Sequence, residues 1–339
     1  LRPRPPHFMK LATYKDGSRD GQLVVVSRDL SSAHYASGIA TRLQQVLDDW
    51  NFLSPQLEEL STTLNHGKAR HAFPFDPRLC MAPLPRAGQW VSACAYLSHE
   101  ERLHPAGDAL PETLRITPQM SQRGGDDLHG ATDPILCQTE AFGIDFGAGL
   151  AVVTGDLPMG CTPEAALEGI RLLVLANAVH LRHLEPAERA RRGGVQSQPA
   201  TAFSPVAVTP DELGTAWQGG RVHLKLDCAR NGKRVGLCET GPEMHFHFGQ
   251  LLSHLCTTRR VRAGSLVGSG TVSNRDASHG QACIAEKRAL ETLADGAAKT
   301  EYLRLGDTVR IDMKGLDGES LFGAIDQDVA AVAASGSTP

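Results

Sequence analysis

A histidine followed directly by two glutamates is the first group in the chain that could do acid–base chemistry. It lies in residues 96–101, which read YLSHEE. A carboxylate beside an imidazole holds the ring in one tautomer, which suits it for taking a proton from water or from an acidic C–H group. The simpler interpretation, an exposed histidine in an acidic loop, stays open at this point.

Four other histidines have spacings that metal ligands use. His180 and His183 are three residues apart on an expected helix, and His245 and His247 alternate on an expected strand. Four imidazoles could hold Zn²⁺ or Ni²⁺. The two pairs lie far apart in sequence, so we prefer the interpretation that they are polar surface and pocket lining.

The elements that position these residues fall into two expected units of an α+β fold. Residues 1–8 are rich in proline and arginine and are interpreted as an extension or a cloning scar. We expect a small N-terminal α/β domain at residues 9–75, a β-rich main domain at residues 76–330 and a flexible tail at residues 331–339.

Hydrophobic spacing predicts particular elements in each unit. In the first, residues 23–26 form a strand, residues 39–50 a helix, and Ser54-Pro55 begins a second helix that ends at Gly67. In the second, a long helix runs from Thr162-Pro163 to residue 185. Hairpins are expected at residues 231–232, joining 221–228 to 234–238, and at 317–318, joining 308–313 to 320–325.

Composition excludes several classes of protein. The 34 lysines and arginines are outnumbered by 38 aspartates and glutamates, so nothing indicates a nucleic-acid partner. The longest apolar stretch, residues 170–179, contains an arginine and an asparagine and is too short to cross a bilayer. The eight cysteines form no C-x-x-C pair, which favours reduced thiols in a cytoplasmic protein.

Several long motifs resemble the fumarylacetoacetate hydrolase family. They are residues 151–159 (AVVTGDLPM), 198–213 (QPATAFSPVAVTPDEL), 268–274 (GSGTVSN), 283–288 (CIAEKR) and 322–326 (FGAID). The resemblance implies a mixed β-sandwich roll behind a small N-terminal domain, a homodimer, and a small-molecule substrate. It also implies chemistry on carbon–carbon bonds next to a 1,3-dicarbonyl or a 2-keto acid.

The resemblance also locates a metal site, and the sequence departs from the family there. Members bind a divalent cation through a Glu-x-Glu pair on a strand and a later Asp, often with a Lys nearby. Residues 145–149 read DFGAG, so the two glutamate positions are Gly147 and Gly149, the aspartate position is Ala178 and the lysine position is Gln198. One remaining carboxylate, Asp145, rarely holds Mg²⁺. We therefore expect no metal and no other cofactor, and an open space where the ligands are missing.

Other site residues are carried over from the family motifs. The resemblance makes His99 a general base that works with Glu101, with Glu286 able to orient the ring. It assigns substrate contacts to Arg182, which can grip a carboxylate, and to Gly270, Thr271, Ser121 and Gln122. Ser121 stands where the family has an aromatic residue, so substrate choice is expected to be altered.

Three functions remain open. The first is an enzyme that enolises a 1,3-dicarbonyl or 2-keto acid without metal, leading to tautomerisation, cyclisation, dehydration or decarboxylation. The second is a ligand-binding pseudoenzyme, and the third is an acylpyruvate or fumarylacetoacetate-type hydrolase. We favour the first, because a binding protein has no need of a histidine flanked by acids.

Overall fold

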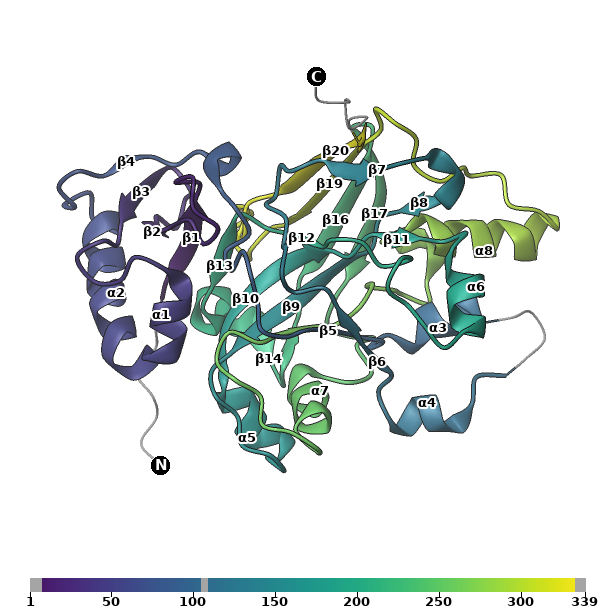
Figure 1. Cartoon of the computed structure of the whole chain (residues 1–339), viewed down its shortest axis with the longest axis horizontal. Coiled ribbons are helices and arrows are strands. Elements are labelled where there is room, and N and C mark those ends of the chain that lie inside the picture. Colours follow the sequence, from purple (N-terminus) through teal and green to yellow (C-terminus); the bar gives the residue numbers. More distant parts are fainter. Residues whose placement is uncertain (1–7, 105–108, 333–339) are drawn as a thin grey trace, which may run out of the picture.

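The N-terminal part is a small antiparallel sheet covered by two helices (Figure 1). The computed structural model describes residues 8–104 and 109–332, so almost all of the expected extension and tail lies outside it. The elements are β1 (Lys10–Tyr14), β2 (Gln22–Val26), β3 (Ser32–Tyr35), α1 (Leu43–Asp48), α2 (Trp50–Asn65) and β4 (Phe73–Pro74).

Strand β2 shows why a continuous apolar run forms this sheet. Successive side chains of a strand point to opposite faces. Leu23 and Val25 pack with Leu47 and Leu57 of the two helices, whereas Val24 and Val26 join the core of the larger part. Both faces of the strand are therefore buried, and the sequence shows no polar alternation.

The larger part contains two main sheets. The small sheet continues into it, because β1 pairs with β13 in the strand order β4-β3-β2-β1-β13-β10-β9-β18-β5-β6, with β12 beside β10. The further strands of this sheet are β5 (Trp90–Ala93), β6 (Met120–Arg123), β9 (Ala148–Thr154), β10 (Ile170–Asn177), β12 (Ala202–Phe203), β13 (Val206–Val208) and β18 (Leu266–Gly268).

The second sheet has the order β17-β16-β19-β20-β7. Its strands are β7 (Ile135–Cys137), β16 (Lys225–Arg230), β17 (Lys233–Glu239), β19 (Thr308–Met313) and β20 (Ile325–Ala331). Two short pairs complete the strands, β8 (Ile144–Asp145) with β11 (His180–Leu181), and β14 (Trp217–Gln218) with β15 (Arg221–Val222). Together with the helices, this is the α+β architecture expected from the sequence.

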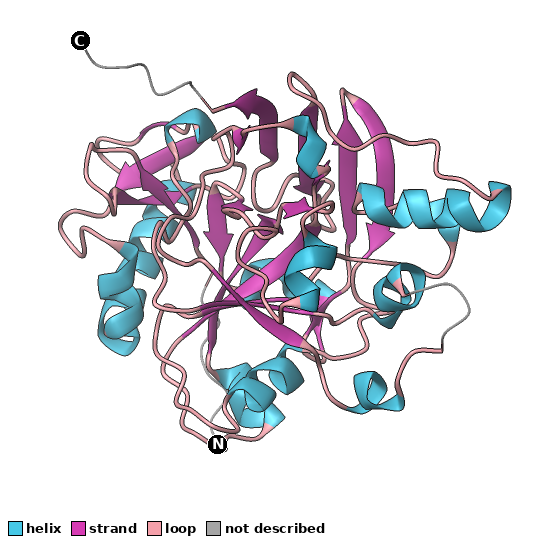
Figure 2. Cartoon of the chain, turned by 45° about the vertical axis from the view of Figure 1, so that its right-hand side comes forward, coloured by secondary structure: helices cyan, strands magenta, loops and turns pink. Residues whose placement is uncertain are grey.

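The remaining helices lie around the strands (Figure 2). They are α3 (Leu97–Leu103), α4 (Glu112–Ile116), α5 (Pro163–Glu168), α6 (Glu185–Ala190), α7 (Phe248–Leu255) and α8 (Ile284–Asp295). Helices α3 and α8 pack against each other, and α8 lies beside the second sheet in both views.

The prediction of a long helix from residue 162 to residue 185 is wrong. Helix α5 ends at Glu168, and Gly169 leads directly into strand β10, which pairs with β9 so that Asn177 lies opposite Ala148. Strand β10 is buried on both faces, so its leucines and valines show no period that separates a strand from a buried helix. His180 and His183 are consequently not on one face of a helix.

Two smaller expectations also need correction. Helix α2 begins at Trp50 and carries Pro55 inside it, so Ser54 is not its N-cap. The hairpin between β16 and β17 turns at Asn231 and Gly232 as expected. In contrast, the partner of β19 is β20, and residues 314 and 320 form only an isolated bridge.

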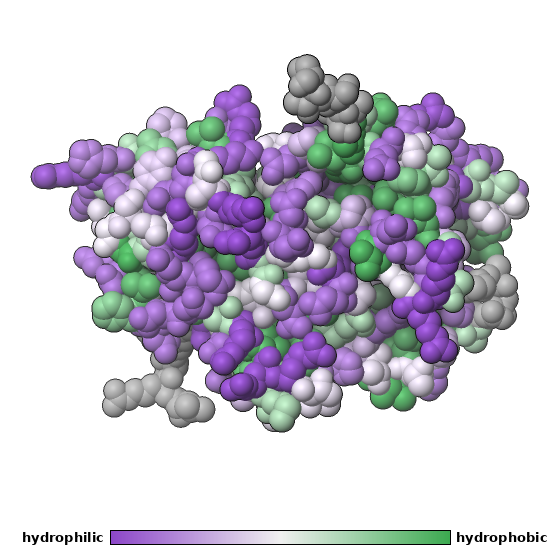
Figure 3. Space-filling view, viewed as in Figure 1, coloured by the Kyte–Doolittle hydropathy of each residue, from purple (hydrophilic) through white to green (hydrophobic). Residues whose placement is uncertain are grey.

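The chain's surface and thiols agree with the composition. In the view of Figure 3, hydrophilic residues extend across the whole face, with smaller groups of hydrophobic residues between them. All eight cysteines are free thiols. In the part of the chain that the structure describes, no helix is long and apolar enough to cross a membrane.

Candidate active site

A single cavity of about 1140 Å³ brings together most of the residues that the family motifs indicated. It lies among α3, β6, α6, the segment that follows β10, and the loop that follows β18. The expected residues that line it are His99, Ser121, Gln122, Ala178, His180, Arg182, Gln198, Gly270 and Thr271.

The loop after β18 enters the site because Gly270 has no side chain. Its φ is +75°, and a Cβ atom there would lie 2.0 Å from the carbonyl oxygen of Ala93. This close approach lets the loop run beside residues 93–95, where the N–H of Ala95 donates to the carbonyl of Ser269 at 3.0 Å. Thr271 is thereby fixed at the wall of the cavity.

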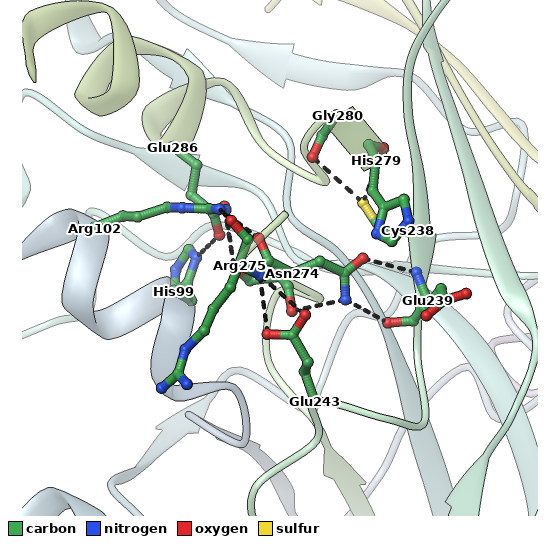
Figure 4. A network of polar contacts seen from close by, with 11 residues as sticks. His99, Arg102, Cys238, Glu239, Glu243, Asn274, Arg275, His279, Gly280 and Glu286 are labelled. Carbon is green, nitrogen blue, oxygen red and sulfur yellow. Dashed lines mark hydrogen bonds and ion pairs between the residues drawn. The ribbon is translucent and has the colours of Figure 1, made fainter. Parts of the chain in front are cut away.

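A buried hydrogen-bond network holds His99 (Figure 4). The Nδ1 atom of His99 lies 2.5 Å from Oε1 of Glu286, which is completely buried in the first turn of α8. The other carboxylate oxygen accepts from Nη1 of Arg102 at 2.5 Å and from the hydroxyl of Ser273 at 3.1 Å. Helices α3 and α8 are thus joined through one carboxylate.

The charge on Glu286 decides the tautomer of His99. Burial raises the pKa of Glu286, but the hydrogen bond with His99 and the charge of Arg102 outweigh it and lower the pKa below its usual range. An ionised carboxylate only accepts hydrogen bonds, so Nδ1 carries the proton. The Nε2 atom is left as the ring atom that can accept a proton from a molecule in the cavity.

Glu101 lies apart from this pair. Its carboxylate forms ion pairs with Arg115 at 3.0 Å and Arg275 at 3.5 Å, and it does not line the cavity. The carboxylate that contacts His99 is Glu286, which follows it by 187 positions. Sequence reasoning missed Arg102, although its position three residues after His99 places both on one face of α3.

Asp145 is a second buried carboxylate, and it links three segments. Its Oδ1 accepts from the N–H of Ile284 at 2.6 Å, and its Oδ2 accepts from the N–H of Ala285 at 3.1 Å and from Nε of Arg182 at 2.9 Å. Burial raises the pKa of Asp145, while Arg182 and the two N–H groups oppose that rise. The carboxylate satisfies the free N–H groups at the start of α8.

His180 and Glu185 extend this cluster toward the cavity. Nδ1 of His180 lies 2.7 Å from Oε1 of Glu185, and Nη1 of Arg182 donates to the same oxygen at 3.1 Å. Burial, followed by the charge of Arg182, lowers the pKa of His180 to about 3. His180 is therefore neutral at physiological pH.

The residues at the family's metal-ligand positions do not fit a divalent cation. Gly147, Gly149 and Ala178 offer no donor side chain, and neither glycine lines the cavity. A Cβ atom at Gly149 would lie 2.2 Å from the Gly270 carbonyl oxygen, and one at Gly147 would lie 2.6 Å from the Ala178 carbonyl oxygen. The expected open space is thus absent at these two glycines, because backbone has closed over them.

The four candidate histidines do not converge either. Nδ1 of His183 donates to the Ala141 carbonyl, Nε2 of His245 donates to the Arg115 carbonyl, and His247 is the N-cap residue of α7. Among the described residues, one group of three possible ligands occurs, namely His99, Cys283 and Glu286. Both carboxylate oxygens of Glu286 are already hydrogen bonded, and burial raises the pKa of the Cys283 thiol well above its usual value.

Comparison with known proteins shows the family. Residues 9–86 match the model of the fumarylacetoacetase N-terminal domain 2, and residues 89–330 match that of the fumarylacetoacetate (FAA) hydrolase C-terminal domain. The chain therefore belongs to the fumarylacetoacetate hydrolase family. No curated protein matches the sequence.

Solved structures share the fold at low sequence identity. A probable 2-hydroxyhepta-2,4-diene-1,7-dioate isomerase from Mycobacterium abscessus has a TM-score of 0.66 at 15% identity. A fumarylacetoacetate hydrolase from Exiguobacterium antarcticum has 0.63 at 17%, and a maleylpyruvate hydrolase from a Sphingobium species has 0.63 at 13%. Each comparison covers 96% of this chain and 100% of the other.

Replacing Gly149 with alanine tests whether the backbone has closed over the ligand position. We expect a loss of about 1–3 kcal/mol in the free energy of unfolding, as overpacking typically costs, measured by urea denaturation. Gly38→Ala is the control, because a Cβ there meets nothing within 4 Å. Equal stability of the two variants would show that residue 149 has room, and that a restored glutamate could also be accommodated.

Replacing Asp145 with alanine tests the buried link between Arg182 and α8. We expect a loss of about 3–5 kcal/mol in the free energy of unfolding, because the charge of Arg182 loses its buried partner. Asp326→Ala removes an exposed carboxylate that pairs with Arg310 at 3.0 Å, and it should cost less than about 1 kcal/mol. A cost at Asp145 no larger than at Asp326 would contradict this assignment.

The lowered pKa of His180 predicts a dependence of stability on pH. The ring is harder to protonate in the folded chain than in the unfolded chain, where its pKa is near 6.5. Acid therefore favours unfolding, and the free energy of unfolding should fall as pH drops from 6.5 toward 4.5. Denaturation of His180→Gln at pH 7 and pH 5 should show a smaller fall than the unsubstituted protein. An identical fall would mean that His180 does not contribute.

Proposed function

We propose that the protein is an enzyme that enolises a small 1,3-dicarbonyl or 2-keto acid, with His99 as the base and without a divalent cation. The observation that carries this proposal is the contact of 2.5 Å between Nδ1 of His99 and the buried carboxylate of Glu286 at the wall of the cavity. The names of the similar structures include an isomerase and hydrolases of dicarbonyl and related acids.

The proposed step is a proton transfer from carbon. Nε2 of His99 takes a proton from the carbon next to the carbonyl. The electron pair of that C–H bond forms a C=C bond, and the π pair of the C=O bond moves to the carbonyl oxygen. The buried charge of Glu286 stabilises the imidazolium that forms. The hydroxyl of Thr271 lines the same cavity and can donate to the developing oxyanion. Return of the proton to another carbon gives tautomerisation, and expulsion of a β-hydroxyl group from the enolate as water gives dehydration. In a decarboxylation the bond to a carboxylate breaks in place of the C–H bond, so that CO₂ leaves and the same enolate forms.

Two other functions are favoured by particular observations. A ligand-binding pseudoenzyme is favoured by the loss of the three ligand side chains while the cavity is kept. A carbon–carbon hydrolase of the acylpyruvate or fumarylacetoacetate type is favoured by membership of the family. Water attack on a carbon–carbon bond is harder without a Lewis acid, which is why we place enolisation first. A homodimer and a cytoplasmic location are also proposals, and they follow from the family resemblance and the thiol content.

Hydrogen–deuterium exchange tests this function without knowledge of the natural substrate. We expect the protein to accelerate exchange at C3 of one or more members of a panel of 2-keto acids and acylpyruvates, followed by proton NMR in D₂O. His99→Gln should lose at least about a hundredfold of the acceleration, in line with the usual contribution of a general base. Glu101→Gln and His34→Gln, whose side chains do not line the cavity, should retain it.

The same experiment separates the alternatives. Addition of EDTA, Mg²⁺ or Mn²⁺ should leave the exchange rate unchanged. Cation-stimulated cleavage of an acylpyruvate would establish the hydrolase instead. Ligand binding by calorimetry with no exchange across the panel would establish the pseudoenzyme.

A further inference from the structure

Arg123 is a buried cation in the cavity that none of the family motifs explains. It ends strand β6, its side chain is only 5% exposed, and it lines the cavity. Its Nη2 atom donates to the carbonyl of Val179 at 2.6 Å, directly beside Ala178. Its Nε atom is buried and has no hydrogen-bond partner among the described residues.

Two more buried polar atoms in the same cavity lack a partner within the described part of the chain. They are Nη2 of Arg182 and Oε1 of Gln198. Arg182 uses its other nitrogens on Asp145 and Glu185, so one arm of its guanidinium is left over. A buried polar atom without a hydrogen-bond partner is destabilising, and two such donors and one such acceptor around one cavity indicate a ligand that completes them.

The charges around the cavity favour an anion. Burial, assisted by the charge of Arg182, lowers the pKa of Arg123 to about 10, so both guanidinium groups are charged at neutral pH. The negative charge of Glu185 raises the pKa of Arg123, but its carboxylate is already hydrogen bonded to both Arg182 and His180. Among the residues that the structure describes, the charged ones that line the cavity are Arg123, Arg182, Arg189 and Arg192 against Glu100 and Glu185.

We propose that Arg123 and Arg182 form a two-arginine site that binds a carboxylate of the ligand, with Gln198 accepting a hydrogen bond from a hydroxyl or amide group of the same molecule. The ligand class is therefore a small carboxylic acid with a neighbouring O–H or N–H group, which includes the enol of a 2-keto acid. Guanidinium groups suit this role because they donate to a carboxylate through two parallel hydrogen bonds.

Arg123 also has a position that matters for the proposed reaction. It contacts Val179, and Ala178 next to it is one of the three positions that lack a carboxylate ligand. A fixed positive charge there stabilises the negative charge of an enolate, which is what a bound dication would otherwise do. This catalytic part rests on the proposed function, whereas binding of the anion does not.

Malonate is a suitable probe, because it is a small carboxylate that does not need to react. We expect it to bind the full-length protein in calorimetry, and the neutral diamide malonamide of the same size to bind at least tenfold more weakly. Arg123→Met should weaken malonate binding by about tenfold or more, as expected for the loss of a hydrogen bond to a charged group. Arg86→Met, which removes an exposed arginine paired with Asp20, should leave binding unchanged.

A second variant keeps the proposal testable if Arg123→Met does not fold. Gln198→Glu places a negative charge in the cavity and should abolish malonate binding in a protein that melts at a similar temperature. The site is disproved if the unsubstituted protein does not bind malonate at a concentration on the order of 50 mM, which would reveal even a weak anion site. It is also disproved if the Gln198→Glu variant binds malonate as tightly as the unsubstituted protein.

His99→Gln separates this site from the proposed function. The variant should bind malonate with unchanged affinity while it loses hydrogen–deuterium exchange. Malonate binding without exchange in any form of the protein would support the arginine site and refute the enolisation. Exchange that depends on His99 but is unaffected by Arg123→Met, in a protein that does not bind malonate, would refute the arginine site alone.

Discussion

The buried carboxylate of Asp145 is the contact on which the rest of the site depends. It is completely buried, and it joins strand β8 to the first N–H groups of α8 and to the guanidinium of Arg182. An ionised group in such a place is stable only when its hydrogen-bonding capacity is filled. This side chain therefore ties the start of α8 to the strands.

The two chemical groups of the cavity are connected through that contact. Glu286 lies in the first turn of α8, one residue after Ala285, whose N–H donates to Asp145. The helix that carries Glu286 and the guanidinium of Arg182 are thus both hydrogen bonded to the same aspartate.

Much of this arrangement could be predicted from the sequence. What could not be predicted is which of the candidate residues contact each other. The family motifs placed His99, Arg182, Gln198 and Thr271 at one cavity. They indicated both Glu101 and Glu286 as partners of His99, but they could not decide between them. The contact with Glu286 spans 187 positions and depends on how α3 packs on α8.

The largest error in secondary structure arose where both faces of an element are buried. Strand β10 was expected as a helix because its leucines and valines have no polar residues between them to reveal a period of two. The closure of backbone over Gly149 could not be predicted either. A glycine in a strand indicates a close approach, but it does not tell which segment approaches or whether space is left.

The pairing of β1 with β13 makes the small N-terminal part a section of the main sheet. Removal of residues 1–75 or 1–86 would uncover the backbone of β13 and create an edge strand that is apolar on both faces. Such edges recruit other strands and lead to aggregation. The N-terminal part is therefore no independent module in this chain, because its first strand completes the sheet that carries the site.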